Sequence, residues 1–152
     1  MNLPKRKSTR IPKYDYSLPN YYFITVCTHE KKCIFGKPGN LNEYGRCAEA
    51  GLLKISEIYP GISLDKYVVM PNHIHAILIV TGTEKEHNIV SAVGQYKMAV
   101  TKKVHEKNPD LTVWQRSFHD HIIRNQSGYE KIWMYIENNP LKWEEDCFYR
   151  NG

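Results

Sequence analysis

The stretch from Tyr67 to Val80 constrains the fold of this chain more than any other, because it is rich in Val, Ile and Leu and carries Pro71-Asn72 at its centre. Proline and asparagine favour a tight turn, and proline cannot continue the ladder of a central strand. Residues 64–69 and 73–80 are therefore predicted to form two strands joined by this turn, as a hairpin. The second strand begins with His73-Ile74-His75, and side chains alternate across a strand. Both imidazoles are thus expected on one face, beside a turn that a substrate can reach.

The histidine pair has two interpretations. Histidines in strands are commonly packed or exposed residues with no special role, and a His-x-His pair can arise by chance. Neutral imidazole is, however, the commonest metal ligand in proteins. Two imidazoles side by side on a rigid strand would make half of a metal site, and both interpretations stay open on these residues alone.

Length and composition set the broad class. A chain of 152 residues is expected to form one domain with a real core, and 41% hydrophobic with 24% charged residues is ordinary for a globular protein. No apolar run approaches the roughly 20 residues that a membrane span needs, and the basic N-terminus leads into no apolar signal core. We therefore expect a cytoplasmic protein without a membrane partner. The cysteines show no Cys-x-x-Cys spacing, which favours reduced thiols over zinc or disulfides; they are Cys27, Cys33, Cys47 and Cys147.

The net charge of +5 is moderate, but the cations are clustered. Residues 1–20 are predicted to be a basic N-terminal arm, and residues 21–152 a single domain. The cationic residues of the arm are Lys5, Arg6, Lys7, Arg10 and Lys13, and a second cluster is Lys102 and Lys103. Cations next to tyrosines suit a phosphate backbone with bases to stack on. A solvated, partly disordered tail is the equal alternative for the arm.

The remaining elements follow from hydrophobic periodicity and capping signals. The expected elements are a strand over 21–28, a helix from Asn42 to about Ile58, a helix capped by Asn88, an irregular strand over 113–123, and a last helix opened by a Ser127–Glu130 capping box and ended at Asn139-Pro140. With the hairpin, the order is strand, helix, strand, strand, helix, strand, helix. This order predicts an α+β, ferredoxin-like sandwich, an antiparallel sheet with helices on one face, plus a C-terminal helix.

The last helix carries Tyr135 and Asn139, which are four residues apart and therefore share one side of it. One interpretation is a tyrosine packed at the edge of the apolar stripe, followed by an ordinary helix-terminal asparagine. The other is chemical, because a tyrosine phenolate can cut a phosphodiester and leave a phosphotyrosine and a free 3′-hydroxyl. The phenol, with a usual pKa of about 10, needs a polarised phosphate. A divalent metal ion, Mg²⁺ or Mn²⁺, on His73, His75 and Asn139 would polarise it.

Two segments resemble a known family. Met70-Pro-Asn-His-Ile-His75 resembles the HUH motif of single-strand DNA nucleases, and Tyr135-Ile-Glu-Asn-Asn-Pro-Leu-Lys-Trp143 resembles the tyrosine helix of REP-associated tyrosine transposases. Three further segments fit the same family, Tyr14–Ser17, Leu41–Gly45 and Trp114–Arg124. The resemblance runs from about Arg10 to Trp143, nearly the whole chain.

The resemblance implies a metal-dependent nickase and strand transferase that acts on single-stranded DNA carrying hairpins. It assigns the nucleophile to Tyr135, metal ligands to His73 and His75, and a third ligand to Asn139, with Asn138 as the competitor. Its members are monomers or dimers, so a homodimer is possible. Backbone contacts, which position DNA without reading its sequence, are expected from the arm, Lys102, Lys103, Arg116 and Arg124. For His119 and His121, phosphate contact or plain packing is expected, with a second ligand pair as the alternative.

Three hypotheses result. The first is an active tyrosine transposase that cuts single-stranded DNA beside short palindromes. The second is a catalytically silent nucleic-acid-binding module of the same fold. The third is a metal-dependent phosphodiesterase with water as nucleophile, which would leave no covalent adduct between protein and DNA.

Overall fold

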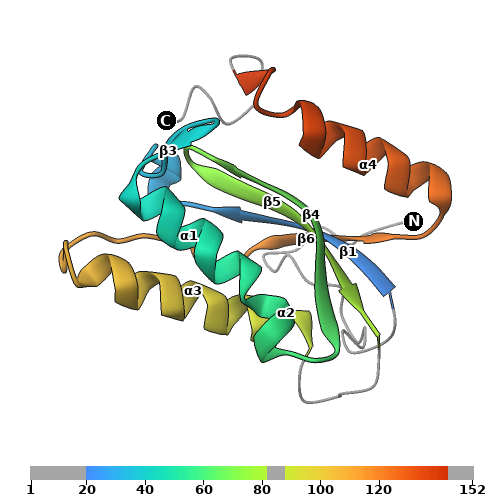
Figure 1. Ribbon diagram of the computed structural model, residues 1–152, viewed down its shortest axis with the longest axis horizontal. Coiled ribbons are helices and arrows are strands. Elements are labelled where there is room, and N and C mark those ends of the chain that lie inside the picture. The colour runs from blue at the N-terminus through green and yellow to red at the C-terminus, as the bar shows by residue number, and fades with distance from the viewer. Residues whose placement is uncertain (1–19, 82–87, 144–152) are drawn as a thin grey trace.

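Four antiparallel strands form the central sheet of the computed structural model, which describes residues 20–81 and 88–143. The strands are β1 (Asn20–Cys27), β4 (Ile62–Met70), β5 (His73–Val80) and β6 (His119–Ile123), in the spatial order β4-β5-β1-β6 (Figure 1). If the four strands of this sheet are numbered along the chain, their spatial order is second, third, first, fourth. With a helical crossover before β4 and another before β6, the arrangement is the expected ferredoxin-like sandwich.

One face of the sheet carries the main core. The helices α1 (Glu43–Leu53), α2 (Ile55–Ile58) and α3 (Ile89–His105) cover this face (Figure 1). Alternate strand residues such as Ile24, Ile74 and Leu78 point into it and are fully buried against helix residues such as Leu52 and Val93. Residues between them in the sequence point to the opposite face, which we call the outer face.

The outer face is crossed by the last helix, α4 (Gln126–Asn138), on the side of the sheet away from α1 and α3 (Figure 1). A small second core forms there, in which Ile136 of α4 packs with Ile77 of β5 and Ile123 of β6. Among the described residues, α4 is the one helix that packs on this face.

A β-bulge in β4 fixes the position of α4. Leu64 pairs with Leu78 and Tyr67 with Ala76, so that two residues, Asp65 and Lys66, lie opposite one residue of β5. Asp65 Oδ2 accepts a 2.6 Å hydrogen bond from the hydroxyl of Tyr129. Lys66 pairs with Glu137 and lies 3.9 Å above the ring of Trp133. The bulge thus holds α4 near both of its ends.

Most of the expected elements are confirmed, and the hairpin turn is Pro71-Asn72 as predicted. The side chains of Asn42 and Asn88 cap α1 and α3 by accepting hydrogen bonds from Gly45 N and Ser91 N. The helix predicted to run to Ile58 is divided at Lys54 into α1 and α2. The described residues also contain three short elements that we did not expect, a 3₁₀ turn (His29–Lys31) and a hairpin of β2 (Gly36–Lys37) with β3 (Asn40–Leu41).

Two predicted boundaries are wrong. The strand expected over 113–123 is regular only from His119, because Ser117 has a positive φ of 63° and the carbonyls of Gln115 and Ser117 accept hydrogen bonds from Lys97. The cap of α4 is Asn125, not Ser127. β6 ends at Ile123, and the Asn125 side chain already accepts a 2.8 Å hydrogen bond from Gly128 N.

No helix among the described residues is long and apolar enough to cross a membrane. The basic arm predicted over 1–20 lies outside the described residues except for Asn20, the first residue of β1.

Candidate active site

His73 and His75 lie together on the outer face at the start of β5, with ring centroids 4.6 Å apart. Strand alternation therefore brings the pair together as the sequence predicted. The expectation that they are directly accessible is wrong, because the exposed fractions of the two residues are 0% and 2%. The indole of Trp143 stacks 6.3 Å from the His73 ring, and the ring of Tyr135 lies 5.2 Å from that of His75. The end of α4 and the turn after it thus cover the pair.

The hydrogen bonds of Asn72 define the tautomer of His73. Asn72 donates its side-chain NH₂ to the carbonyl of Lys31 over 3.1 Å, so its Oδ1 is the atom 2.8 Å from Nδ1 of His73. An amide oxygen can only accept, and Nδ1 of His73 must therefore carry the proton. In the neutral ring the lone pair is then on Nε2, which is the arrangement that a metal ligand needs.

Thr25 of β1 holds His75. The two residues pair directly in the sheet, and Thr25 Oγ1 lies 2.9 Å from Nδ1 of His75. Nε2 of His75 is buried without a hydrogen-bond partner among the described residues. Burial, and secondly the neighbouring His73, lower the pKa of His75 well below its usual value. His75 is therefore neutral at physiological pH and can offer a nitrogen lone pair.

Tyr135 is placed at the edge of this pair. It is 45% exposed, and besides His75 its ring meets Phe23 edge-on at 6.3 Å. Phe23 in turn stacks on His75 at 5.3 Å. The other tyrosine of α4, Tyr129, is in a different state, because its hydrogen bond to Asp65 raises its pKa to about 12. Of these two phenols, Tyr135 is the one that is in contact with the histidines.

Asn139 is the C-cap of α4 and is buried, with an exposed fraction of 4%. It lies four residues after Tyr135 and four before Trp143, the residues whose rings contact His75 and His73. Its competitor Asn138 is half-buried. Within residues 20–81 and 88–143, no group of three His, Cys, Asp or Glu side chains could hold a metal ion. A third protein ligand from this region would therefore be of another type, such as an amide.

Four of the cations predicted to contact DNA lie in the described part of the chain. Lys102 and Lys103 lie in the last turn of α3, on the opposite side of the sheet from the histidine pair. Arg116 and Arg124 flank β6 and are both exposed, whereas the arm residues Lys5, Arg6, Lys7, Arg10 and Lys13 lie outside the described part of the chain. Of the two basic clusters, only Lys102 and Lys103 are described, and they do not lie on the face that carries the histidine pair.

His119 and His121 are exposed on the outer face of the edge strand β6. Their partners on β1 are Thr25 and Phe23, both of which contact His75. Their exposure excludes simple packing. They extend the surface around the buried pair, and phosphate contact remains a prediction for them.

Sequence reasoning missed four residues that shape the site, namely Phe23, Thr25, Asn72 and Trp143. Thr25 and Phe23 are adjacent to the pair only through the register of β1 with β5, which no local pattern contains. The sequence predicts Asn72 as a turn residue and as part of the segment that resembles the HUH motif, but assigns it no role at the histidines. The signal that could have identified this role is an amide side chain directly before His73 in the sequence, where it can hydrogen-bond to the imidazole.

Comparisons with known proteins identify the family of this chain. The family model described as "Transposase IS200 like" matches residues 16–139. An uncharacterised protein of Haemophilus influenzae is 32% identical, over 95% of this chain and 93% of its own length. A second protein of the same organism, named there as a candidate REP-associated tyrosine transposase, is 22% identical over 90% of this chain and 84% of its own.

Among solved structures, a REP-associated tyrosine transposase bound to a REP hairpin superposes with a TM-score of 0.70 and 22% identity, covering 90% of this chain and 74% of its own. At this identity the likeness shows a shared fold. The family match extends over most of the chain and includes the histidine pair and the tyrosine helix. This chain belongs to the IS200-like transposase family.

Proposed function

We propose that this protein is a single-strand DNA nickase and strand transferase of the REP-associated type, with Tyr135 as the nucleophile. The observation that carries the proposal is the contact between the half-exposed ring of Tyr135 and the buried ring of His75. This contact brings an accessible nucleophile next to imidazoles that are held in a fixed orientation. Family membership supports the reaction class.

In the cleavage step, the phenol oxygen of Tyr135 attacks a backbone phosphorus and loses its proton. The bond from phosphorus to the 3′ oxygen breaks, and that oxygen takes up a proton to become a free 3′-hydroxyl. The protein then carries the strand as a 5′-phosphotyrosine. In strand transfer, a 3′-hydroxyl attacks this linkage, and the phenol leaves and regains its proton.

Three features of the chain prepare this step. Asn72 and Thr25 orient the two imidazoles, and the bulge contacts to Tyr129 and Lys66 fix α4 on the sheet. Phe23, in contact with both His75 and Tyr135, limits the positions that the tyrosine ring can adopt. Positioning of the reacting groups is a major source of rate in phosphoryl transfer.

The residues at the site fit a divalent metal ion. Burying an imidazole nitrogen that has no hydrogen bond is unfavourable, and Nε2 of His75 is such an atom. The lone pair of His73 lies on its Nε2, and the ion would be held by the Nε2 atoms of the two histidines and the amide oxygen of Asn139. When bound, Mg²⁺ or Mn²⁺ would polarise the phosphate and neutralise charge on its oxygens.

The proposed substrate is single-stranded DNA with a short palindrome near the cleavage site. This is supported by the structural relative, which was solved with a REP hairpin bound. The exposed His119, His121 and Arg124 lie on or beside the edge strand of the outer face, where they could contact the phosphates of such a strand.

A cleavage assay tests the proposal. Labelled single strands carrying any short palindromes found beside the gene would be incubated with wild type, Tyr135→Phe and Tyr44→Phe, in Mn²⁺ and in EDTA, and separated on denaturing gels. The proposal predicts a metal-dependent covalent adduct that Tyr135→Phe loses and that the matched control Tyr44→Phe, on α1 at the other face of the sheet, keeps. Free 5′-phosphate products without an adduct would indicate water as the nucleophile. Binding without any cleavage would indicate the catalytically silent module.

A further inference from the structure

A second site lies on the outer face, at the opposite end of β1 and β5 from the histidine pair. It is a cavity of about 600 Å³, a size common for sites that enclose a small organic group. Buried Val80 and Ile123 form part of its wall together with Ile79. Its polar and aromatic lining residues are Asn20, Tyr21, Arg124, Asn125, Gln126 and Tyr129.

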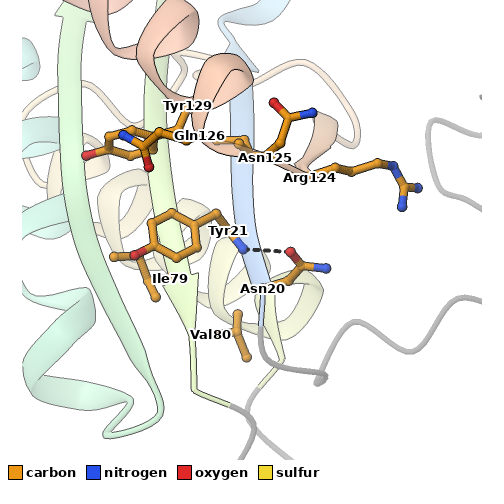
Figure 2. A pocket seen from close by; sticks show the side chains of 9 residues that line it. Asn20, Tyr21, Ile79, Val80, Arg124, Asn125, Gln126 and Tyr129 are labelled. Carbon is orange, nitrogen blue, oxygen red and sulfur yellow. Dashed lines mark hydrogen bonds between the residues drawn. The ribbon is translucent and has the colours of Figure 1, made fainter.

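The aromatic part of the cavity is a pair of tyrosines. Tyr21 is 41% exposed, and its ring meets that of Tyr129 edge-on at 5.7 Å. The hydroxyl of Tyr129 is bonded to Asp65, which fixes this ring and lets it support Tyr21. Figure 2 shows both rings on the same side of β1. An exposed ring held in place by a second ring is a platform on which a flat group can stack.

The polar part of the cavity consists of three amides and a guanidinium. Asn125 uses its Oδ1 to cap α4, so its NH₂ group is the end that it can offer to a ligand. The side chain of Gln126 is exposed and makes a 3.1 Å hydrogen bond with Glu130 of the same helix. The guanidinium of Arg124 points away from the two rings, as Figure 2 shows. Hydrogen-bonding groups next to a stacking surface, with a cation farther out, match a base and its phosphate.

We propose that this cavity binds one unstacked nucleobase of the single-stranded DNA whose cleavage is proposed above, so this inference rests on that function. Single-stranded nucleic acids are bound by stacking bases on aromatic side chains and by bonding their edges. The Gln126 amide keeps its Oε1 and a second N–H besides the one that it donates to Glu130. An amide that offers both groups pairs well with the edge of adenine, which makes adenine the preferred base. Arg124 takes an adjacent phosphate.

The position of the cavity suits this role. Tyr21 precedes Thr25, the partner of His75, by four residues of β1, which is about 13 Å along a strand. Gln126 and Tyr135 belong to the same helix. A strand lying along the outer face can therefore contact the cavity and the nucleophile within a few nucleotides, and the base in the cavity helps to select which phosphate meets Tyr135.

The test is a set of DNA-binding titrations in EDTA with Tyr135→Phe as the parent protein, so that cleavage is neither needed nor possible. Dodecamers of deoxyadenosine, of thymidine and of abasic sites would be titrated into the parent, into the same protein with Tyr21→Leu, and into one with Gln126→Ala. Tyr44→Leu, a half-buried tyrosine on α1 at the other face, is the matched control.

We expect Tyr21→Leu to weaken binding of the adenine strand by about 5- to 100-fold. Binding of the abasic strand should change less than about twofold, because its phosphates are intact. Gln126→Ala should weaken adenine binding more than binding of a thymidine dodecamer. Tyr44→Leu should leave binding of all three strands unaffected.

Equal losses for the adenine and abasic strands, or none for either, would overturn the proposal. This outcome is separable from failure of the proposed function. If wild type forms the covalent adduct in the cleavage assay, but Tyr21→Leu weakens binding of the adenine and abasic strands equally or not at all, only the base site is refuted. If Tyr21→Leu loses affinity for the adenine strand but not for the abasic strand, and wild type forms no adduct, the base site is supported and the nickase function is refuted.

Discussion

The ring of Tyr135 lies 5.2 Å from the ring of His75, with the two planes inclined by 63°. Tyr135 comes from α4 and His75 from β5, and they are separated by sixty positions of the sequence. Their contact requires that α4 cross the outer face in a defined position. The candidate nucleophile is therefore placed by tertiary docking and not by any local motif.

The tautomer of His73 leads to a prediction about metal affinity. Asn72→Ala removes the acceptor that holds the proton on Nδ1, so Mn²⁺ affinity should fall about 10- to 100-fold. Asn72→Asp keeps an acceptor at this place and should retain more of the affinity. Isothermal titration of Mn²⁺ into the two variants and wild type measures this, and equal affinity in all three would contradict the assigned role of Asn72.

The contacts of Lys66 with Glu137 and Trp133 predict a defect in positioning α4. Lys66→Ala should lower the free energy of unfolding by only about 1 kcal/mol, because partly exposed ion pairs and cation–π contacts are weak. Amide exchange should nevertheless accelerate in α4 relative to α3, and cleavage should slow while hairpin affinity is kept. Lys131→Ala, an exposed lysine on the same helix, is the control, and equal effects of the two substitutions would contradict the account.

The small core between α4 and the sheet predicts a larger loss of stability. Ile136 is 1% exposed and packs with Ile77 and Ile123. Ile136→Ala should lower the free energy of unfolding by about 2–4 kcal/mol, measured by urea denaturation. The exposed Met134 on the same helix supplies the comparison, and Met134→Ala should cost less than about 1 kcal/mol.

Tyr129 supplies a prediction about pH. Its bond to Asp65 raises its pKa to about 12 in the folded protein, above the usual value of about 10 in an unfolded chain. The stabilisation from this bond is therefore complete below pH 10 and is lost as the pH rises from 10 toward 12. In Asp65→Asn the pKa of Tyr129 should fall toward 10. Carbon-13 NMR of the labelled tyrosine rings follows this titration, and an unchanged pKa for Tyr129 would show that Asp65 is not the cause.

Much of the fold could be predicted from the sequence, because its signals are local. Pro71-Asn72 between two apolar runs is enough to define the hairpin, and Asn42 and Asn88 mark the starts of two helices. The order of these elements then identifies the ferredoxin-like sandwich. The alternation of β5 correctly placed His73 and His75 on one face.

The sequence did not predict the surroundings of the site, because they depend on contacts between distant elements. The bond of Thr25 to His75 follows from the register of β1 with β5. The burial of the histidine pair follows from α4 lying over it, which in turn depends on the bulge at Asp65 and Lys66. A bulge adds one residue to one strand, and nothing in the apolar pattern of β4 marks where it occurs.

Peptide mapping of the covalent complex tests the central claim most directly. Wild type would be trapped on a single-stranded hairpin DNA, digested with trypsin and nuclease, and analysed by mass spectrometry for the tyrosine that carries the nucleotide. The account predicts a single modified peptide with the nucleotide on Tyr135. A nucleotide on Tyr129 or on any other residue, or a cleaved strand with no modified peptide, would contradict it.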